Sequence, residues 1–379
     1  MNRSSIFGKK IDFEKSKGTY LHDKISDKKF IDFFGMYSSV SIGYNHEIFD
    51  CEDYRDELLR VSNIKITNCE MLSDESSEFD EMFRNYTSLG IYDSYHYTCT
   101  GALAVEAAIK TAMDYKGSGF QRIISFKGSF HGINGYGGII TDRFDPVSQR
   151  LDGFPGGYYE KFTNPIITYE KGKPLKDNSL VQATLIKIKE TIVQNNDTCA
   201  IVVEPIQCTY GDRYFPNSFF IGLREIASEF DIPLIFDEIQ VGFGATGKIW
   251  FFENTPIKPD IICFGKKTQL SGIAVKKKFT NIFKKSIRLE VTWDADLLDM
   301  VRCKQIIKAY KKYNVLDNVR DQSRTLLNGL KENKFLLNIR NKGLLFAFDF
   351  ESRKIRDHFV IELERNGLIC NPTRDKTIR

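Results

Sequence analysis

The chain has 379 residues, of which 42% are hydrophobic and 27% charged, so it can bury a large core in more than one structural unit. Its 54 basic and 50 acidic residues leave a formal charge of +4, and no nucleic-acid-binding motif accompanies the lysine-rich residues 276–285. No apolar run approaches the ~20 residues that cross a bilayer, and residues 1–10 lack an apolar secretory core. We therefore expect a cytoplasmic globular protein with neither a nucleic-acid nor a membrane partner.

The eight cysteines are scattered along the chain, without a C-x-x-C pair or a histidine at metal-ligand spacing. Paired cysteines or Cys/His clusters at short spacings are what structural zinc sites and disulfide frameworks require. The sequence therefore predicts no metal site and a reducing compartment.

The first stretch with a chemical interpretation follows a predicted hairpin (residues 18–34) and two predicted helices (52–61 and 76–89). Thr100-Gly101-Ala102 opens a strongly helical run that extends beyond Lys110. Free N–H groups and the positive end of the helix dipole suit a phosphate, and Gly101 lets an anion approach the backbone. An ordinary threonine or glycine cap would give the same pattern.

A glycine-rich loop (residues 127–138) follows the predicted strand 122–126. Within it, Phe130 precedes His131-Gly132 and could lay its ring over a planar ligand, although a core phenylalanine beside a capped histidine is the alternative. Residues 142–176 are rich in Gly, Pro, Tyr and Phe and lack periodicity. They predict a long irregular excursion near the site or a subunit interface.

Short apolar strands then alternate with helices: strands 200–204, 233–237 and 260–264, and helices 180–194 and 218–230. This alternation predicts an α/β fold with a parallel sheet that is covered by helices on both faces. Ligands of such sheets bind at the carboxyl ends of the strands. Glu204, Asp237 and Lys266 each follow a strand, so we expect them to share a site, although a structural salt bridge would also explain Asp237 and Lys266.

After residue 285 the parallel pattern stops. Helices are predicted at 296–312, 317–332 and 356–365, and strands at 342–350 and 368–370. This mixture predicts a smaller α+β domain that the N-terminal hairpin completes. We expect residues 1–50 to form an N-terminal segment that contributes to the small domain. Residues 51–284 would form a large cofactor-binding domain, and residues 285–379 the C-terminal small domain.

Four of these features together match the needs of pyridoxal phosphate. The cofactor requires a lysine for a Schiff base, a carboxylate to keep its ring nitrogen protonated, an anion site and a ring that stacks on it. Lys266, Asp237, residues 100–102 and Phe130 can supply these four parts. The protonated ring then serves as an electron sink, and the lysine amine is available as a general base.

Five motifs resemble the class III aminotransferases, most closely the lysine 6-aminotransferases. They occur in the family's order and lie at residues 101–106, 129–132, 204–207, 236–247 and 258–272. The resemblance covers the chain from about residue 18 onward. It implies the type I pyridoxal-phosphate fold, a homodimer with two active sites at the subunit interface, and amine and oxo-acid substrates.

The same resemblance assigns the reacting groups. Lys266 would form the Schiff base, with its neighbour Lys267 as the alternative. Asp237 would pair with the ring nitrogen, and Glu204 would lie beside the ring. Thr292 matches a threonine that reaches the phosphate from the partner subunit, so cofactor binding would need the dimer.

The remaining positions surround the cofactor. Ile239 would pack under the ring, Phe130 would stack on its other face, and Gln240 would reach the ring hydroxyl. Gly101 and Ala102 would offer their backbone N–H groups to the phosphate.

Three departures from the family pattern concern the substrate. Ile133 stands where the lysine 6-aminotransferases have a carboxylate-binding arginine, and an apolar side chain cannot replace a guanidinium. Thr209 replaces a gating glutamate, and Arg379 aligns close to, but not on, the arginine that binds the 2-oxoglutarate carboxylate. The alternatives are a pyridoxal-phosphate-binding relative without turnover, or a related decarboxylase or racemase.

Overall fold

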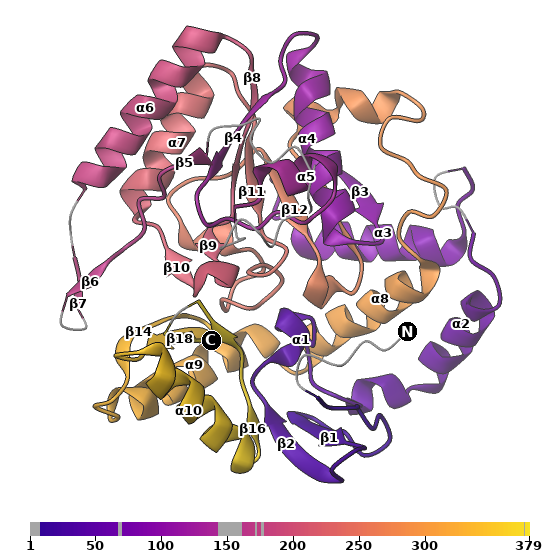
Figure 1. Cartoon of the computed structure of the whole chain (residues 1–379). Helices are drawn as coiled ribbons and strands as arrows, with labels where there is room; N and C mark the ends of the chain where they lie inside the picture. The colour runs from indigo at the N-terminus through magenta and orange to yellow at the C-terminus, as the bar shows by residue number, and fades with distance from the viewer. Residues whose placement is uncertain (1–7, 67–69, 143–160, 171–172, 176–177, 375) are drawn as a thin grey trace.

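The computed structural model describes residues 8–66, 70–142, 161–170, 173–175, 178–374 and 376–379. At its centre lies a seven-stranded sheet of order β3-β13-β12-β11-β8-β4-β5 (Figure 1). Within it β13 runs antiparallel to both β12 and β3, whereas the other neighbouring strands are parallel. The strands are β3 (Ser94–Thr98), β4 (Arg122–Phe126), β5 (Lys161–Phe162), β8 (Thr198–Val203), β11 (Leu234–Asp237), β12 (Ile261–Phe264) and β13 (Ser271–Val275).

Helices cover both faces of this sheet, as the alternation in the sequence predicts. Along β8, Val202 faces a cluster with the alanine-rich helix α4 (Gly101–Lys116), whereas Ile201 and Val203 face the other cluster. That second cluster includes side chains from α6 (Ser179–Asn195) and α7 (Asn217–Glu229). Because the strands are buried on both faces, they are apolar at nearly every position.

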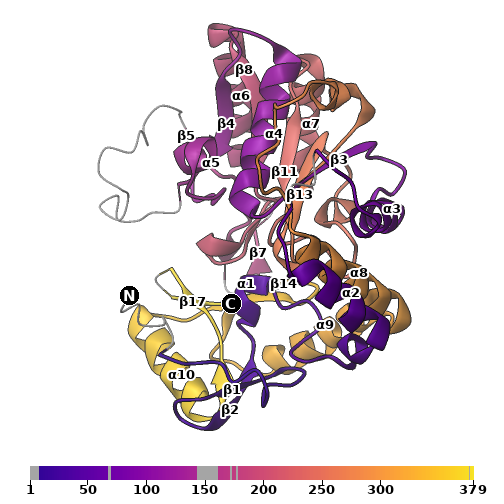
Figure 2. The ribbon, with the colours of Figure 1, turned by 90° about the vertical axis from the view of Figure 1, so that its right-hand side faces the viewer.

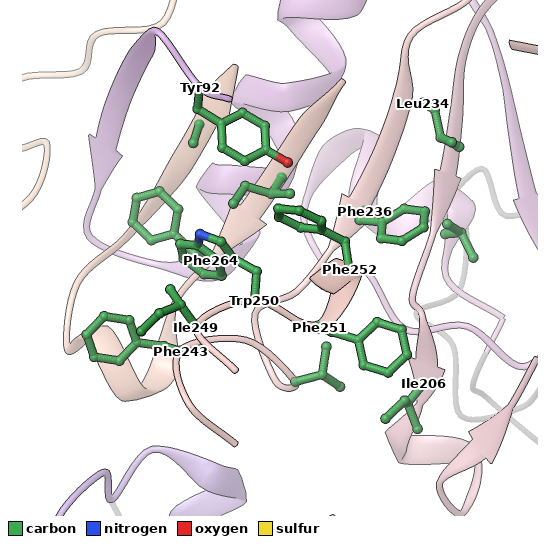
Figure 3. Packing of buried hydrophobic residues seen from close by; sticks show 14 of the residues in the cluster. Tyr92, Ile206, Leu234, Phe236, Phe243, Ile249, Trp250, Phe251, Phe252 and Phe264 are labelled. Atoms are coloured by element: carbon green, nitrogen blue, oxygen red, sulfur yellow. The ribbon is translucent and has the colours of Figure 1, made fainter. Parts of the chain in front are cut away.

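The segment after β11 is fixed by aromatic packing (Figure 3). Trp250 is fully buried, and its Nε1 donates to the carbonyl of Thr87 at 2.8 Å. The buried Glu238 carboxylate accepts hydrogen bonds from the backbone N–H groups of Phe251 and Phe252, and burial raises the pKa of Glu238 to about 8. Glu238 therefore holds the chain that leaves Asp237 in a single path.

Three helices form a layer beside the sheet: α2 (Glu52–Ser62), α3 (Asp74–Thr87) and α8 (Leu297–Lys312). The apolar side chains of α8 belong to the same large cluster as α3, and α8 packs against both α2 and α3. The buried Lys304 ammonium on α8 contacts the carboxylates of Glu57 and Glu78, which ties the three helices together.

A second, antiparallel sheet has the order β14-β15-β18-β17, and a third joins the N-terminal hairpin to β16 (Figures 1 and 2). The predicted hairpin is confirmed, and its second strand pairs in parallel with β16, which is more than 300 residues later in the chain. These elements are β1 (Tyr20–Asp23), β2 (Lys28–Asp32), α9 (Val315–Lys331), β14 (Leu337–Lys342), β15 (Leu345–Asp349), α10 (Arg353–Arg365), β16 (Leu368–Ile369), β17 (Pro372–Thr373) and β18 (Thr377–Ile378).

Three local expectations differ from the structure. The strand predicted at 342–350 is the second strand of a hairpin, because Gly343 turns at φ 58° between β14 and β15. The last residues of the predicted glycine-rich loop 127–138 form the start of a short helix, α5. Strands β3 and β13 are not predicted, because residues 94–98 and 271–275 show no strong strand pattern.

Most of the predicted excursion at 142–176 lies outside the described residues. Further short elements are α1 (Gly35–Ser38), α5 (Gly135–Ile140), β6 (Tyr169–Glu170), β7 (Lys173–Pro174), β9 (Ile206–Gln207), β10 (Arg213–Tyr214), and the 3₁₀ turns η1 (Glu47–Asp50), η3 (Cys208–Tyr210), η4 (Phe251–Asn254), η5 (Lys266–Thr268) and η6 (Lys277–Lys284).

Among the described residues, no helix combines the length and apolarity that a membrane crossing needs. The same part of the chain holds no group of three or more histidine, cysteine, aspartate or glutamate side chains that could bind a metal ion.

Candidate active site

The carboxyl ends of β8, β11 and β12 bring three predicted residues together. β11 lies between the other two strands, with Asp237 opposite Cys263 and Phe236 opposite Val203. Glu204 follows β8, and Lys266 follows β12 after one glycine. The charges of Asp237 and Lys266 both act on the Glu204 carboxyl, as expected for side chains that share one edge of a parallel sheet.

Lys266 occupies a left-handed backbone position with φ 57°, at the start of the turn η5. Its Nζ donates to the side-chain oxygen of Gln240 at 2.9 Å. Burial lowers the pKa of Lys266 to about 8, while the carboxylates of Glu204 and Asp237 act in the opposite direction. Roughly a tenth of this amine is therefore neutral, and so nucleophilic, at pH 7, far more than for a lysine with its ordinary pKa.

Lys267 differs from its neighbour in its surroundings. Its Nζ donates to the carbonyl of Ser38 at 3.2 Å, to Ser38 Oγ at 2.9 Å and to the carbonyl of Gln240 at 2.8 Å. Burial and the charge of Lys266 lower the pKa of Lys267 to about 7. This side chain fixes the N-terminal turn α1 against the strand ends rather than facing Glu204 and Asp237.

Asp237 is held by His131, a residue that is not among the predicted site residues. Asp237 Oδ2 lies 2.9 Å from Nδ1 of His131, and Oδ1 accepts the N–H of Ile239 at 3.2 Å. His131 is 1% exposed, and its Nε2 has no hydrogen-bond partner among the described residues. The signal for it in the sequence is the His131-Gly132 pair that follows Phe130 in the glycine-rich loop.

Glu204 follows β8, on the opposite side of Asp237 from Lys266. Its two carboxyl oxygens accept the N–H of Phe130 at 3.0 Å and the N–H of Cys208 at 2.6 Å. Burial, helped by the nearby charge of Asp237, raises the pKa of Glu204 to about 8. Glu204 therefore holds a proton at neutral pH and keeps the Phe130 loop at the strand ends.

The N-terminus of α4 also lies at these strand ends, because Gly101 packs against Ile239. Thr100 Oγ1 accepts the N–H of Leu103 at 3.4 Å, so a side chain caps this helix. A Cβ on Gly101 would lie 2.9 Å from Cδ1 of Ile239, and one on Gly265 would lie 3.4 Å from Cγ2 of the same residue. The Ile239 side chain therefore lies between the helix terminus and the lysine-bearing strand end.

Ala102, in the first turn of α4, packs against the loop that carries Phe130. Its Cβ is 3.2 Å from the position of a Cβ on Gly132, whose φ is 98°. A left-handed glycine in such close contact leaves no room for a side chain. Ala102 and Phe130 thus lie with the predicted residues at the strand ends.

Thr292 is the one predicted residue that the described structure leaves apart. It lies in an exposed turn before α8, and no described contact links it to the other predicted side chains. Its neighbour Trp293 is 55% exposed, and the carbonyl of Trp293 accepts a hydrogen bond from Cys99 Sγ at 2.6 Å. The turn therefore packs close to the cap of α4, with Thr292 on the surface.

Arg379 lies at the site, although sequence reasoning placed it only near the position of a substrate-binding arginine. Its Nη1 is 3.6 Å from Asp212 Oδ1, and its backbone exchanges two 3.0 Å hydrogen bonds with Asn371. The guanidinium is near enough to Lys266 to help lower the pKa of that amine. The predicted Thr209 has a buried hydroxyl oxygen without a partner among the described residues.

A cavity of about 520 Å³ opens beside these groups, and both Gln240 and Arg379 line it. Ile133, by contrast, is 63% exposed and does not line this cavity. A lysine with a lowered pKa, a buried carboxylate and a helix N-terminus thus lie at one set of strand ends, and Arg379 lines the adjoining cavity. This set of groups suits an organic cofactor and a small anionic substrate.

Known proteins share this arrangement of elements. A family model described as Aminotransferase class-III matches residues 4–379. An L-lysine-epsilon aminotransferase of Mycobacterium tuberculosis (strain ATCC 25618 / H37Rv) is 29% identical over 97% of this chain and 86% of the relative. A 4-aminobutyrate aminotransferase of Dictyostelium discoideum is 27% identical over 97% of this chain and 80% of the relative.

A solved structure described as lysine aminotransferase from M. tuberculosis in the internal aldimine form matches with a TM-score of 0.91 at 28% identity, covering 100% of this chain and 91% of that one. The predicted α/β architecture, the type I fold of pyridoxal-phosphate enzymes, is therefore confirmed. Because the family model spans nearly the whole sequence, this chain belongs to the class III aminotransferases, enzymes that transfer an amino group from an amine to an oxo acid.

Proposed function

We propose that this chain binds pyridoxal 5'-phosphate at the carboxyl ends of β8, β11 and β12, and transfers an amino group from a terminal primary amine to a 2-oxo acid such as 2-oxoglutarate. The observation that carries the proposal is the placement of Lys266, with its lowered pKa, beside the buried pair of Asp237 and His131. A nucleophilic amine next to a fixed carboxylate is what this cofactor needs.

The residues present fit the cofactor. A Cβ on Gly101 would fill the space at the N-terminus of α4, so glycine keeps the backbone N–H groups of Gly101 and Ala102 accessible to a phosphate. Ile239 lies between that terminus and Lys266, where it would pack against one face of the ring. Phe130 would cover the other face, and Gln240, which already accepts from Lys266, would reach the ring hydroxyl.

Asp237 would hold the proton on the ring nitrogen. Its carboxylate is buried and oriented by His131 and by the N–H of Ile239, so it presents a fixed negative charge to a cationic partner. When bound, the cofactor supplies an electron sink for the carbon that carries the amino group.

Lys266 would hold the cofactor covalently and, once released, move a proton as a general base. Glu204, which is protonated near neutral pH, would orient the Phe130 loop and hold its proton beside the ring.

Arg379 supports an oxo acid as the acceptor. Its guanidinium lines the cavity beside Gln240, and its only described ion pair, with Asp212, spans 3.6 Å rather than a close bidentate distance. A substrate carboxylate could therefore compete for it. As the donor we propose a terminal amine, because the names of two relatives, lysine-epsilon and 4-aminobutyrate aminotransferase, describe such amines.

We further propose a homodimer that works in the cytoplasm. Ile64, Val291 and Trp293 are exposed apolar side chains, and Lys65 contacts both the Trp293 ring and Asp296, so the end of α2 and the turn that carries Thr292 form one surface. Burial of this surface would bring Thr292 to the partner's phosphate site. The described cysteines are unpaired, which fits a reducing compartment.

The test starts with purified protein that is reconstituted with pyridoxal phosphate. We expect a visible absorption band from covalently held cofactor, which Lys266→Ala abolishes and Lys267→Ala retains, with folding of both variants checked by circular dichroism. Mixing the loaded protein with lysine, 4-aminobutyrate or cadaverine should then shift the band to the amine form of the cofactor.

A colourless wild type would reject cofactor binding. A band that no amine shifts would favour the relative without turnover. Loss of carbon dioxide or inversion of the amino acid without amine-form cofactor would favour the decarboxylase or racemase.

A further inference from the structure

The amine of Lys267 contacts both segments that flank the Lys266 amine. Gln240 lies between the two lysines: its side-chain oxygen accepts from Lys266 Nζ at 2.9 Å, and its backbone carbonyl accepts from Lys267 Nζ at 2.8 Å. The centre of the Tyr37 ring lies 5.9 Å from Lys266 Nζ, and the next residue, Ser38, accepts two hydrogen bonds from Lys267. One buried side chain is therefore bonded to the segment of Gln240 and to the segment of Tyr37.

The segment that carries Tyr37 needs contacts of this kind. Residues 35–38 all have positive φ, from 50° to 71°, so α1 is a left-handed turn. Its own hydrogen bonds run from the N–H groups of Ser39 and Val40 to the carbonyl of Gly35, at 2.9 and 3.1 Å. Non-glycine residues persist in this backbone region only where surrounding contacts hold them.

Contacts from outside the turn hold both of its ends. At its start, Asp32 accepts two backbone N–H groups, both at 2.9 Å. At its end, Lys267 donates to Ser38, and Gln269 Nε2 donates to the carbonyl of Ser39 at 2.9 Å. Because Lys267 lies in η5 directly after Lys266, these bonds fix the left-handed turn relative to the reacting amine.

The Lys267 amine satisfies its partners in either protonation state. It is 5% exposed, and it meets two carbonyls and one hydroxyl, none of which carries a charge. A protonated amine donates to all three, whereas a neutral amine donates to the two carbonyls and accepts from the hydroxyl. A buried amine without such bonds would be costly, so the three acceptors make this position specific for a lysine.

From this we propose that Lys267 is a positioning residue for amino transfer, because its amine holds Tyr37 and Gln240 beside the Lys266 amine. The inference rests on the proposed function and adds a residue to its site. Tyr37 is 41% exposed, so its ring can contact a substrate that approaches Lys266 from solvent. Lys267 acts only through the residues that it holds, and its loss should leave the covalent attachment of the cofactor intact.

The test compares Lys267→Met, Tyr37→Ala and the double variant as cofactor-loaded proteins. Methionine keeps an apolar stem of similar length and removes the three hydrogen bonds. Lys354→Met, at an exposed position on α10, is the matched control. Absorbance reports the attached cofactor, and the half-reaction with lysine, 4-aminobutyrate or cadaverine gives a limiting rate and a half-saturation. Hydrogen exchange with mass spectrometry reports the backbone of residues 34–40.

We expect Lys267→Met to keep the absorption band and to raise the half-saturation at least about fivefold, more than it changes the limiting rate. Exchange of residues 34–40 should also become at least about fivefold faster, since one hydrogen bond changes an equilibrium by about this factor. The control should match the wild type in all three measurements. In the Tyr37→Ala background, Lys267→Met should raise the half-saturation by a smaller factor, because its effect passes through Tyr37.

Three results would overturn the inference. One is loss of the band in Lys267→Met when circular dichroism shows a folded protein, since Lys267 would then hold the cofactor. The others are unchanged exchange of residues 34–40 and equal factors with and without the Tyr37 ring.

Should Lys267→Met fail to fold, Ser38→Ala removes only the hydroxyl acceptor. It should change exchange and half-saturation in the same direction by smaller factors, and wild-type values in this variant would also count against the inference. If the wild type converts no amine, the proposed function fails, whereas exchange and the absorption band still decide whether Lys267 holds the turn.

Discussion

At the scale of single residues, the site depends on how burial changes proton affinity. Two adjacent lysines have the same ordinary pKa, yet they differ in partners: Lys266 has one side-chain acceptor, and Lys267 has three acceptors. Glu204 and Lys266 are moved in opposite directions, since burial disfavours the charged form of each. Because both pKa values are about 8, the Glu204 carboxyl is mostly neutral at pH 7, and the Lys266 amine loses its proton more readily than an exposed lysine does.

Lys266 should react as a nucleophile from about pH 8. With a pKa of about 8 in the folded chain and 10.5 as its ordinary value, competitive acetylation followed by mass spectrometry should show half-maximal labelling near pH 8 in the cofactor-free protein. The same residue in urea should need a pH near 10.5. Because the unfolded chain binds more protons at this site between these values, the group's contribution to the free energy of unfolding rises with pH there. Equal midpoints in both states would contradict the burial effect.

His131 should be a positioning residue for Asp237. His131→Leu removes the contact at Nδ1 and leaves Asp237 Oδ2 buried without that partner, which should lower the free energy of unfolding by about 1–3 kcal/mol. Urea denaturation measures this change. His358→Leu, at an exposed position on α10, should alter it by less than about 0.5 kcal/mol. Equal effects of the two substitutions would remove His131 from the site.

At the scale of elements, the candidate cofactor pocket depends on close approach between α4, the β11 end and the β12 end. Glycine at 101 and 265 permits that approach, and Ile239 fills the space between them. The antiparallel strand β13 supports the same region, since a Cβ on Gly265 would lie 2.6 Å from Ser271 Oγ.

Gly101→Ala should therefore be destabilising, although alanine is the better helix former. The new Cβ would lie 2.9 Å from Ile239 Cδ1, and overpacking of this kind costs about 1–3 kcal/mol. Ile239→Val removes Cδ1, so the double variant should recover most of the loss in a thermal or urea denaturation. Additive losses in the double variant would show that the contact with Ile239 is not the cause.

At the level of the whole molecule, the chain folds back so that the N-terminal hairpin lies beside β16. The hairpin strand β2 pairs with β16, and the cavity lies between the hairpin and the second sheet. The division of the chain at residues 50 and 284 stays a prediction. Helix α8, which follows residue 284, packs on α2 and α3 and so connects the C-terminal part of the chain to the large core.

The proposed dimer can be tested at its exposed surface. Trp293→Glu places a charge in the apolar surface with Ile64 and Val291, so we expect a shift from dimer to monomer and weaker cofactor binding. Phe335→Glu, at a site 83% exposed beside β14, should leave the dimer intact. Analytical ultracentrifugation gives both masses, and a monomeric wild type at micromolar concentration would reject the proposal.

The alternating α/β pattern and most of the candidate site can be predicted from the sequence alone. Apolar strands next to amphipathic helices report local burial, and a parallel sheet forces strand ends together, so Glu204, Asp237 and Lys266 could be paired without coordinates. Gly101 and Phe130 were identifiable from glycine-rich spacing and order.

Contacts between distant segments cannot be predicted from local sequence patterns. The contact between His131 and Asp237 spans 106 residues, and the approach of Arg379 to Asp212 spans more than 160, so no local periodicity encodes either. Strand β13 and the left-handed turn at Gly35–Ser38 are likewise set by partners elsewhere in the chain. The residues that line the cavity come from the hairpin, α9 and α10, segments far apart in the sequence that meet beside Gln240.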